Sequence, residues 1–200
     1  PINMDVTDAK TNLLDSFIYA ADDDSQGVNL VFDGKVIVGT RAKKEHAKSY
    51  NAFSSINFPY LAVIQDGILV RYIPEIPCRH AVKFYYDMKD SVYVLKLIPG
   101  MKPDILSYLF EHYDCLVIES FGVGGIPQTL EFRRVLFRSN MTVYEVGKKV
   151  KQDFNMIEAY DMTLEAVITK LMWLMGREEQ DMQKAFYTQI NHDILFTKRG

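Results

Sequence analysis

Two short apolar segments with an Asp-Gly pair at their centre dominate the first part of the chain. Residues 28–38 read VNLVFDGKVIV and residues 61–70 read LAVIQDGILV. An Asp-Gly pair can adopt the positive φ angles of a type I′ turn, and β-branched runs on both sides favour strands. The pattern predicts two antiparallel hairpins.

Apolar positions elsewhere recur at helical spacing. Residues 11–21 carry such a stripe, and we expect it to be buried against the rest of the domain. A second helix is predicted over residues 163–175 with Gly176 as its stop, and a third from about 178 to 191. Residues 142–145 (TVYE) fit a capping box. The stripe in the first helix consists of Leu13, Leu14, Phe17, Ile18 and Ala21.

A strand, a helix and a second strand follow one another over residues 91–98, 103–112 and 115–119. A crossover of this length joins parallel strands, so the later part of the chain is predicted to contain a parallel sheet. Prolines and mixed polar residues over 73–90 indicate an interdomain linker. We therefore predict an α/β protein divided into residues 1–72, a linker at 73–90, and residues 91–200.

Composition narrows the possible partners. With 23 basic and 26 acidic residues among 200, the net charge of -3 gives no reason to expect nucleic acid or an anionic membrane surface. The apolar runs are too short to cross a bilayer, and no signal peptide opens the chain. Cys78 and Cys115 lack metal-ligand spacing, as do the four histidines, so we expect reduced thiols, no metal and a cytoplasmic location.

Several motifs together resemble the bacterial type I (cytoplasmic-type) L-asparaginases. The resemblance covers nearly the whole chain and implies the end of the N-terminal asparaginase domain followed by the smaller C-terminal α/β domain. The segments that carry it are 7–13 (TDAKTNL), 39–44 (GTRAKK), 52–57 (AFSSIN), 119–127 (ESFGVGGIP) and 161–166 (DMTLEA).

The resemblance implies hydrolysis of the side-chain amide of L-asparagine to aspartate and ammonia, without a cofactor. In that family a threonine attacks the amide, assisted by a second threonine, an aspartate and a lysine, and the matching lysine here is Lys44. A hydroxyl is a poor nucleophile until its proton is taken, and a lysine whose pKa is lowered by burial near other cations can take it. Without the resemblance, Arg41, Lys43, Lys44 and Lys48 would be interpreted as a solvated charged face.

The family's threonine motifs, Thr-Gly-Gly-Thr and Gly-Thr-Asp-Thr, occur nowhere in the 200 residues. The resemblance places both of them before Pro1, so we expect an N-terminally truncated chain that is itself inactive. Thr7, Thr11 and Thr40 are interpreted as loop, cap or turn residues rather than as replacement nucleophiles.

A glycine loop follows the predicted strand at 115–119. Structurally, its glycines allow a tight strand-to-helix turn. The resemblance also implies that this loop approaches the active site of a neighbouring subunit, which makes the parent protein a homodimer or homotetramer. The loop residues concerned are Ser120, Gly122, Gly124 and Gly125.

Residues 130–139 (LEFRRVLFRS) have neither clean helical nor clean strand periodicity. They are the translation of one frame of a short-read sequencing adapter, CTGGAGTTCAGACGTGTGCTCTTCCGATCT. Our hypothesis is that this decapeptide is an assembly artefact that replaces genuine protein sequence. The alternatives are a natural basic strand or loop, and an anion-binding patch built by Arg133, Arg134 and Arg138.

Two other functions stay open at the level of the sequence. The asparaginase-like subunit of a tRNA-dependent amidotransferase shares the same core. A non-catalytic α/β ligand-binding or oligomerisation module would share the fold without the chemistry.

Overall fold

The computed structural model describes residues 3–4, 7–47, 49–77, 81–102, 104–119, 136–137, 157–177 and 179–195. The chain divides into two compact units, Pro1–Phe84 with Asn191–Asp193, and Tyr85–Ile190 with Ile194–Gly200. The division after Phe84 falls inside the segment 73–90, and the domain boundaries given above stay a prediction. The predicted α/β class is confirmed, with an antiparallel sheet in the first unit and a parallel sheet in the second.

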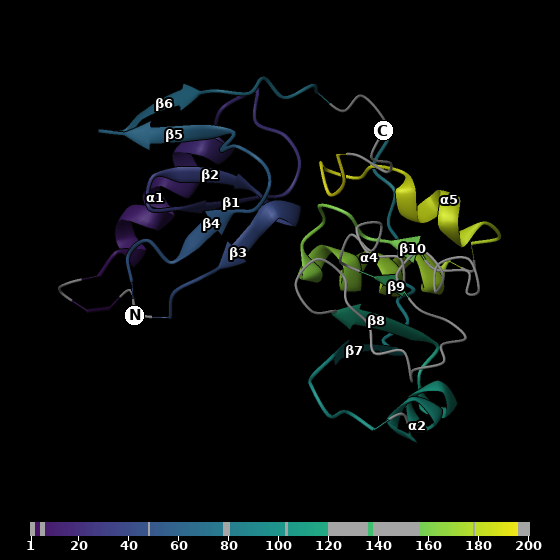
Figure 1. Ribbon diagram of the computed structural model, residues 1–200. Coiled ribbons are helices and arrows are strands. Elements are labelled where there is room, and N and C mark those ends of the chain that lie inside the picture. The colour runs from purple at the N-terminus through teal and green to yellow at the C-terminus, as the bar shows by residue number, and fades with distance from the viewer. Residues whose placement is uncertain are drawn as a thin grey trace. The chain divides into compact units, whose positions relative to one another are not determined.

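The first unit contains a four-stranded antiparallel sheet in the order β1-β2-β5-β6, and a separate pair formed by β3 and β4. One helix, α1, packs on β1 (Figure 1). Its elements in chain order are α1 (Ala9–Ala20), β1 (Asn29–Phe32), β2 (Lys35–Val38), the 3-10 turn η1 (Gly39–Arg41), β3 (Ala42–Lys44), β4 (Phe53–Ser55), β5 (Ala62–Gln65) and β6 (Ile68–Arg71).

Both predicted hairpins are confirmed. Asp33 and Gly34 connect β1 to β2 with φ angles of 52° and 67°. Asp66 and Gly67 connect β5 to β6 with φ angles of 52° and 75°. Positive φ at both central residues is the requirement of a type I′ turn, which explains why Asp-Gly pairs occupy these positions.

The predicted buried stripe of α1 is wrong for most of its positions, although the helix itself is present and Ile18 packs against the core of the unit. Leu13, Leu14 and Phe17 are 46%, 60% and 64% exposed, whereas Asp15 and Tyr19 are 7% and 6% exposed. The helix presents the face with Tyr19 to the sheet, where this ring joins the core of the unit. The Asp15 carboxyl is buried with it, and burial raises its pKa.

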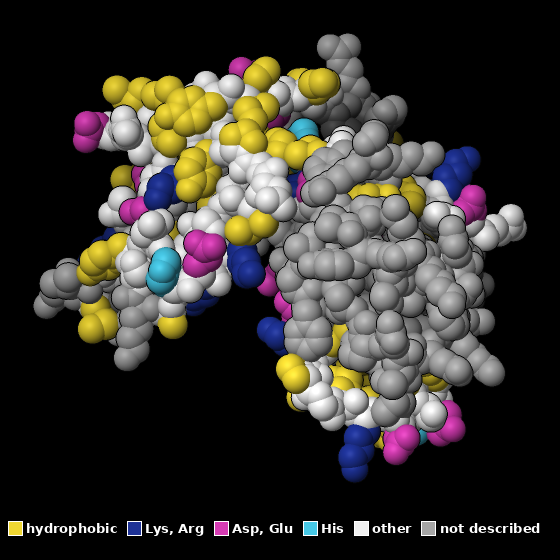
Figure 2. All heavy atoms as spheres, viewed as in Figure 1, with side chains coloured by type: hydrophobic (Ala, Val, Ile, Leu, Met, Phe, Trp, Pro, Cys, Tyr) yellow, Lys and Arg dark blue, Asp and Glu magenta, His cyan; other side chains and the backbone are white. Residues whose placement is uncertain are grey.

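Other apolar side chains of the first unit are exposed along its last strand. Ile68, Val70 and Tyr72 are 66%, 42% and 59% exposed. Figure 2 shows hydrophobic side chains gathered over β5 and β6. Like the α1 stripe, these positions have apolar side chains that the described residues do not cover.

The second unit is built on a parallel sheet in the order β10-β9-β8-β7, as predicted. Alternate residues of β8 serve two cores: Leu116 and Ile118 pack with α2, and Cys115 and Val117 pack with α4 and α5 (Figure 1). The elements are β7 (Val92–Lys96), α2 (Asp104–His112), β8 (Cys115–Glu119), β9 (Leu136–Phe137), β10 (Ile157–Glu158), α4 (Leu164–Gly176) and α5 (Met182–Tyr187).

Helix α4 begins as predicted and ends differently. Thr163 is its N-cap, and the Thr163 hydroxyl accepts a hydrogen bond from the Ala166 amide at 3.2 Å. Gly176 belongs to the helix, and Arg177 is the C-cap in a right-handed conformation. Gly176 is therefore not a left-handed stop: a Cβ there would lie 2.2 Å from the Asp87 carbonyl oxygen, so the glycine permits a close backbone approach. Helix α5 is shorter than the predicted 178–191.

Several predictions fall outside the described residues. Among these are the capping box at 142–145, Cys78, Lys48, and the glycine-loop positions Ser120, Gly122, Gly124 and Gly125. Of the decapeptide 130–139, only Leu136–Phe137 is described, and it forms β9, parallel to β8. A strand of two residues does not test the absence of clean periodicity over the decapeptide, and the origin of the decapeptide stays a hypothesis.

Candidate functional site

Lys44 is the last residue of β3. It pairs with Phe53 of β4, and the next residue continues the ladder, since the Glu45 amide donates to the Ala52 carbonyl at 2.8 Å. The Lys44 ammonium lies 5.9 Å from the centroid of the Phe53 ring. The side chain is exposed, so the burial that we expected around this lysine is not provided by the described residues. Pairing with β4 fixes the backbone of Lys44 and leaves its ammonium accessible.

The interpretation of residues 41–44 as one solvated charged face is wrong for Arg41. Arg41 is 0% exposed, and its Nε donates to the His192 carbonyl at 2.6 Å. Lys43 is half-buried and pairs with Ser54, so its side chain leaves the strand on the face opposite to that of Lys44. The cationic residues of this motif therefore have different environments and different roles.

Of the three threonines named above, Thr7 and Thr40 form hydrogen bonds typical of structural residues. The Thr7 hydroxyl accepts from the Ala9 amide at 3.1 Å at the start of α1, and the Thr40 hydroxyl donates to the Asn191 carbonyl at 2.6 Å. Thr11 is exposed on α1. These contacts agree with loop, cap and turn roles.

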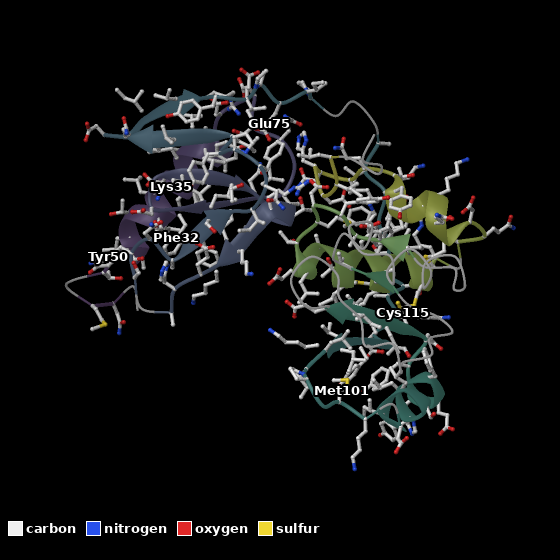
Figure 3. The ribbon with its side chains drawn as sticks, viewed as in Figure 1. Phe32, Lys35, Tyr50, Glu75, Met101 and Cys115 are labelled. Carbon is white, nitrogen blue, oxygen red and sulfur yellow. The ribbon has the colours of Figure 1, made fainter. Side chains whose placement is uncertain are left out.

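The structure brings the motif at 7–13 against the first hairpin. The Asn12 side-chain oxygen accepts from the Asp33 amide at 2.8 Å, at the turn of the hairpin. Lys35, which is labelled in Figure 3, follows that turn. Its ammonium binds Asp33 at 2.9 Å and the Asn51 side-chain oxygen at 3.1 Å. Three segments that are separate in the sequence thus meet at one end of the hairpin. The Asp-Gly turn signal located this place, but nothing in the sequence showed which side chains would reach it.

Two serines on β4 were missed by the sequence interpretation. Ser54 and Ser55 lie opposite Lys43 and Ala42 in register, and among the described residues their hydroxyl oxygens are buried without a hydrogen-bond partner. A buried polar group without a partner is costly.

A polar network lies beside β1 and α1. The Tyr19 hydroxyl donates to Glu75 at 2.5 Å and accepts from the Asn29 amide group at 3.0 Å. Arg71 bonds Glu75 at 2.8 Å and Asp22 at 2.6 Å; Glu75 is labelled in Figure 3. Burial, and then the hydrogen bond to Glu75, raise the pKa of Tyr19. A cavity of about 480 Å³ adjoins the network, lined by Ser16, Tyr19, Ala20, Ser25, Gln26, Gly27, Asn29 and Val31.

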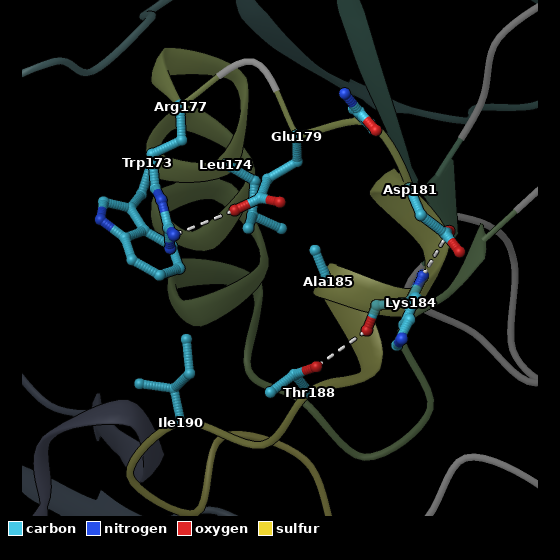
Figure 4. A pocket seen from close by; sticks show the side chains of 10 residues that line it. Trp173, Leu174, Arg177, Glu179, Asp181, Lys184, Ala185, Thr188 and Ile190 are labelled. Carbon is cyan, nitrogen blue, oxygen red and sulfur yellow. Dashed lines mark hydrogen bonds and ion pairs between the residues drawn. The ribbon is translucent and has the colours of Figure 1, made fainter.

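The second unit has a cavity of about 590 Å³ beside α4 and α5 (Figure 4). Arg177 at its edge binds Glu179 at 3.1 Å and lies 4.4 Å and 4.7 Å from the ring centroids of Trp173 and Tyr85. The hydroxyl of Thr188 donates to the Lys184 carbonyl at 3.0 Å, so no base activates it. The cavity is an open surface hollow with both polar and apolar side chains, and the described residues that line it do not supply the nucleophile and base of a catalytic site.

Metal and thiol chemistry find no support in the part of the chain that is described. No group of three or more His, Cys, Asp or Glu residues there could hold a metal ion. Burial raises the pKa of the Cys115 thiol to about 12. Within the same residues, no helix has the length and apolar character needed to cross a bilayer.

Comparisons with known proteins agree with the α/β fold described above. Residues 1–76 match the family model described as "Asparaginase, N-terminal". The chain is 32% identical over 215 residues to an L-asparaginase of Thermococcus kodakarensis, covering 97% of this chain and 65% of that protein. These matches show that the chain is similar to L-asparaginases. The solved structure of the thermostable L-asparaginase from the same organism superposes with a TM-score of 0.83 at 28% identity, over 98% of this chain and 65% of that one.

A relative with another name also matches. A glutamyl-tRNA(Gln) amidotransferase polypeptide of Methanosphaera stadtmanae is 30% identical over 203 residues, covering 86% of this chain and 45% of that protein. The chain thus spans less than two thirds of either relative. The asparaginase fold is common to these matches, and the chemistry of the whole protein has to be argued separately.

Proposed function

We propose that this chain is the part of an L-asparaginase that supplies the catalytic lysine, Lys44. The observation that carries the proposal is the 32% identity to a protein named L-asparaginase over 97% of the chain. The exposed ammonium at the end of a hydrogen-bonded hairpin is consistent with a group that acts on a substrate. The parent reaction is hydrolysis of the side-chain amide of L-asparagine to L-aspartate and ammonia, without a cofactor.

In this proposal a threonine hydroxyl attacks the side-chain carbonyl carbon of asparagine. The C–N bond breaks, the amide nitrogen takes up the hydroxyl proton and leaves as ammonia, and an acyl-enzyme ester remains, which water then hydrolyses to aspartate. Lys44 assists by taking the hydroxyl proton and passing it to the departing nitrogen; in the second step a proton from water restores the hydroxyl. The threonine belongs to motifs that do not occur in the 200 residues, so the chain by itself is expected to lack activity.

The proposal extends to the assembly. The parent acts in the cytoplasm as a homodimer or homotetramer, in which the loop carrying Ser120, Gly122, Gly124 and Gly125 approaches the active site of a neighbouring subunit. Neither nucleic acid nor a membrane is expected as a partner, because charge and hydropathy favour neither.

Reading the source DNA upstream of the codon for Pro1 tests the proposal. We expect an open reading frame with the two threonine motifs, and the protein expressed from it releases ammonia from L-asparagine. The 200-residue chain is the control and releases none. Absence of the motifs upstream would favour a non-catalytic module, and ammonia release by the 200-residue chain above that of its Lys44→Ala variant would contradict the assigned mechanism.

The asparaginase-like subunit of an amidotransferase is a second candidate, favoured by the 30% identity to the Methanosphaera stadtmanae protein. It predicts an additional domain before the threonine motifs in the upstream reading frame. A reading frame that begins shortly before the first threonine motif would support the asparaginase instead.

A further inference from the structure

We infer that Arg41 and Thr40 form an anchor that binds residues 191–193 and thereby positions Lys44. The inference rests on the proposed function for the role of Lys44, and on the contacts of the first unit for the anchor itself. Residues 191–193 are grouped with the first unit, although they come near the end of the chain. The anchor is therefore a contact inside that unit.

Two side chains of η1 bind successive carbonyl groups of this segment. Arg41 Nε donates to the His192 carbonyl at 2.6 Å, and the Thr40 hydroxyl donates to the Asn191 carbonyl at 2.6 Å. In return, the Asn191 side-chain amide donates to the Val28 carbonyl at 3.1 Å, just before β1. The segment is thus hydrogen-bonded to residues just before and just after the β1-β2 hairpin in the sequence.

Ring packing and backbone conformation indicate that the segment is held in a definite shape. The His192 ring stacks on Phe58 with a centroid distance of 4.9 Å. Asn191 and His192 have φ angles of 47° and 57°, a left-handed conformation that is uncommon for non-glycine residues and that Asn and His adopt more readily than most. Gly27 faces them, since a Cβ at this glycine would lie 3.0 Å from the Asn191 side-chain oxygen.

The burial of Arg41 indicates that its contacts in the anchor are specific. A guanidinium cannot be deprotonated in a protein, so burying it is unfavourable unless its donors are satisfied. Arg41 is nevertheless 0% exposed and is the largest fully buried side chain among the described residues. A charged donor to a carbonyl is one of the stronger hydrogen bonds in proteins. The chain thus buries a permanent charge immediately before the strand that ends at Lys44.

The backbone connects this anchor to Lys44. The Arg41 carbonyl accepts from the Ile56 amide at 2.9 Å, and the ladder continues through the pairs of β3 and β4 to Lys44 and Phe53. A strand of three residues forms few backbone hydrogen bonds. The position of the residue before it therefore determines where its last residue lies. Arg41 acts on the reaction through Lys44 and is a positioning residue.

Amide hydrogen exchange on the 200-residue chain tests the anchor without any activity. Arg41→Lys keeps the charge and loses the guanidinium geometry, and Thr40→Val keeps the shape and loses the hydroxyl. We expect both variants to accelerate exchange at the Ile56 and Glu45 amides by about 10-fold. The matched control is Arg71→Lys, an ion-paired arginine on β6 in the other sheet, which leaves these amides unchanged. Unchanged exchange in both η1 variants would overturn the anchor.

Kinetics of the asparaginase with both threonine motifs test the positioning. Arg41→Lys and Thr40→Val are expected to lower kcat by about 10-fold to 100-fold with KM within about twofold, because a displaced catalytic group slows chemistry rather than binding. Arg71→Lys lowers the melting temperature and leaves kcat unchanged. Full kcat in either η1 variant with accelerated exchange would overturn the positioning role. An unmodified enzyme that releases no ammonia would refute the proposed function, while the exchange result still decides the anchor.

Discussion

Arg41 and Lys44 belong to one basic motif and have opposite environments. Arg41 is fully buried against carbonyl groups near the end of the chain, and Lys44 is exposed. A run of basic residues favours a solvated surface on composition alone. The partner of Arg41 lies 151 positions away in the sequence, so no local pattern could reveal that this side chain is buried. Lys44 could be singled out only because the neighbouring segments resemble those of a known enzyme family.

The Cys115 thiol gives a prediction at the residue scale. Burial raises its pKa from 9.0 to about 12, so the folded protein keeps it protonated where an unfolded chain would ionise. Between about pH 9 and 12 the unfolded state therefore binds fewer protons than the folded state. The free energy of unfolding falls as pH rises through that window. In a Cys78→Ser variant, a thiol-specific disulfide reagent at pH 8 should not react until denaturant is added. One equivalent of rapid reaction in the folded protein would contradict this account.

At the scale of elements, turn chemistry was more informative than apolar periodicity. The Asp-Gly pairs located both hairpins, because few residue pairs tolerate two successive positive φ angles. The apolar stripe of α1 identified a helix and assigned its buried face wrongly. Leu13, Leu14 and Phe17 are exposed because the sheet contacts the face carrying Tyr19, whose hydroxyl is satisfied by Glu75. Periodicity shows that a helix has an apolar face, but it does not show what covers that face.

Gly176 gives a prediction for the end of α4. An alanine in place of an open helix glycine stabilises by about 1 kcal/mol, but here its Cβ would meet the Asp87 backbone. We expect Gly176→Ala to lower the free energy of unfolding by about 1–3 kcal/mol. The substitution should also speed exchange at the Lys89 amide, which donates to the Met172 carbonyl at 3.0 Å.

Thr169→Ala is the matched control, since this residue is exposed on the same helix and should change stability by no more than about 0.5 kcal/mol. Urea unfolding of both variants measures the difference. A stabilised Gly176→Ala protein would show that the approach of residue 87 to this helix is not a tight contact.

At the scale of the molecule, the α/β class and the parallel sheet followed from the order of predicted strands and helices. The catalytic assignment followed from the resemblance alone, because a single lysine at a strand end has no chemical signature of its own. The similarity to the Thermococcus protein extends over 97% of the chain and 65% of that protein, so it rests on most of the sequence and not on any individual residue. The anchor of residues 191–193 depends on a long-range contact and could be found only in the folded structure.

The central claim is that Lys44 belongs to an asparagine-hydrolysing site, and a pair of adjacent lysines tests it most directly. In the enzyme expressed with both threonine motifs, steady-state ammonia release from L-asparagine is measured for Lys44→Met and Lys43→Met. The two side chains leave β3 on opposite faces, so the second variant controls for lost charge and altered strand propensity. We predict a loss of kcat of about 100-fold or more for Lys44→Met and less than about threefold for Lys43→Met. Equal activity of the Lys44→Met variant and the unmodified enzyme would contradict the account.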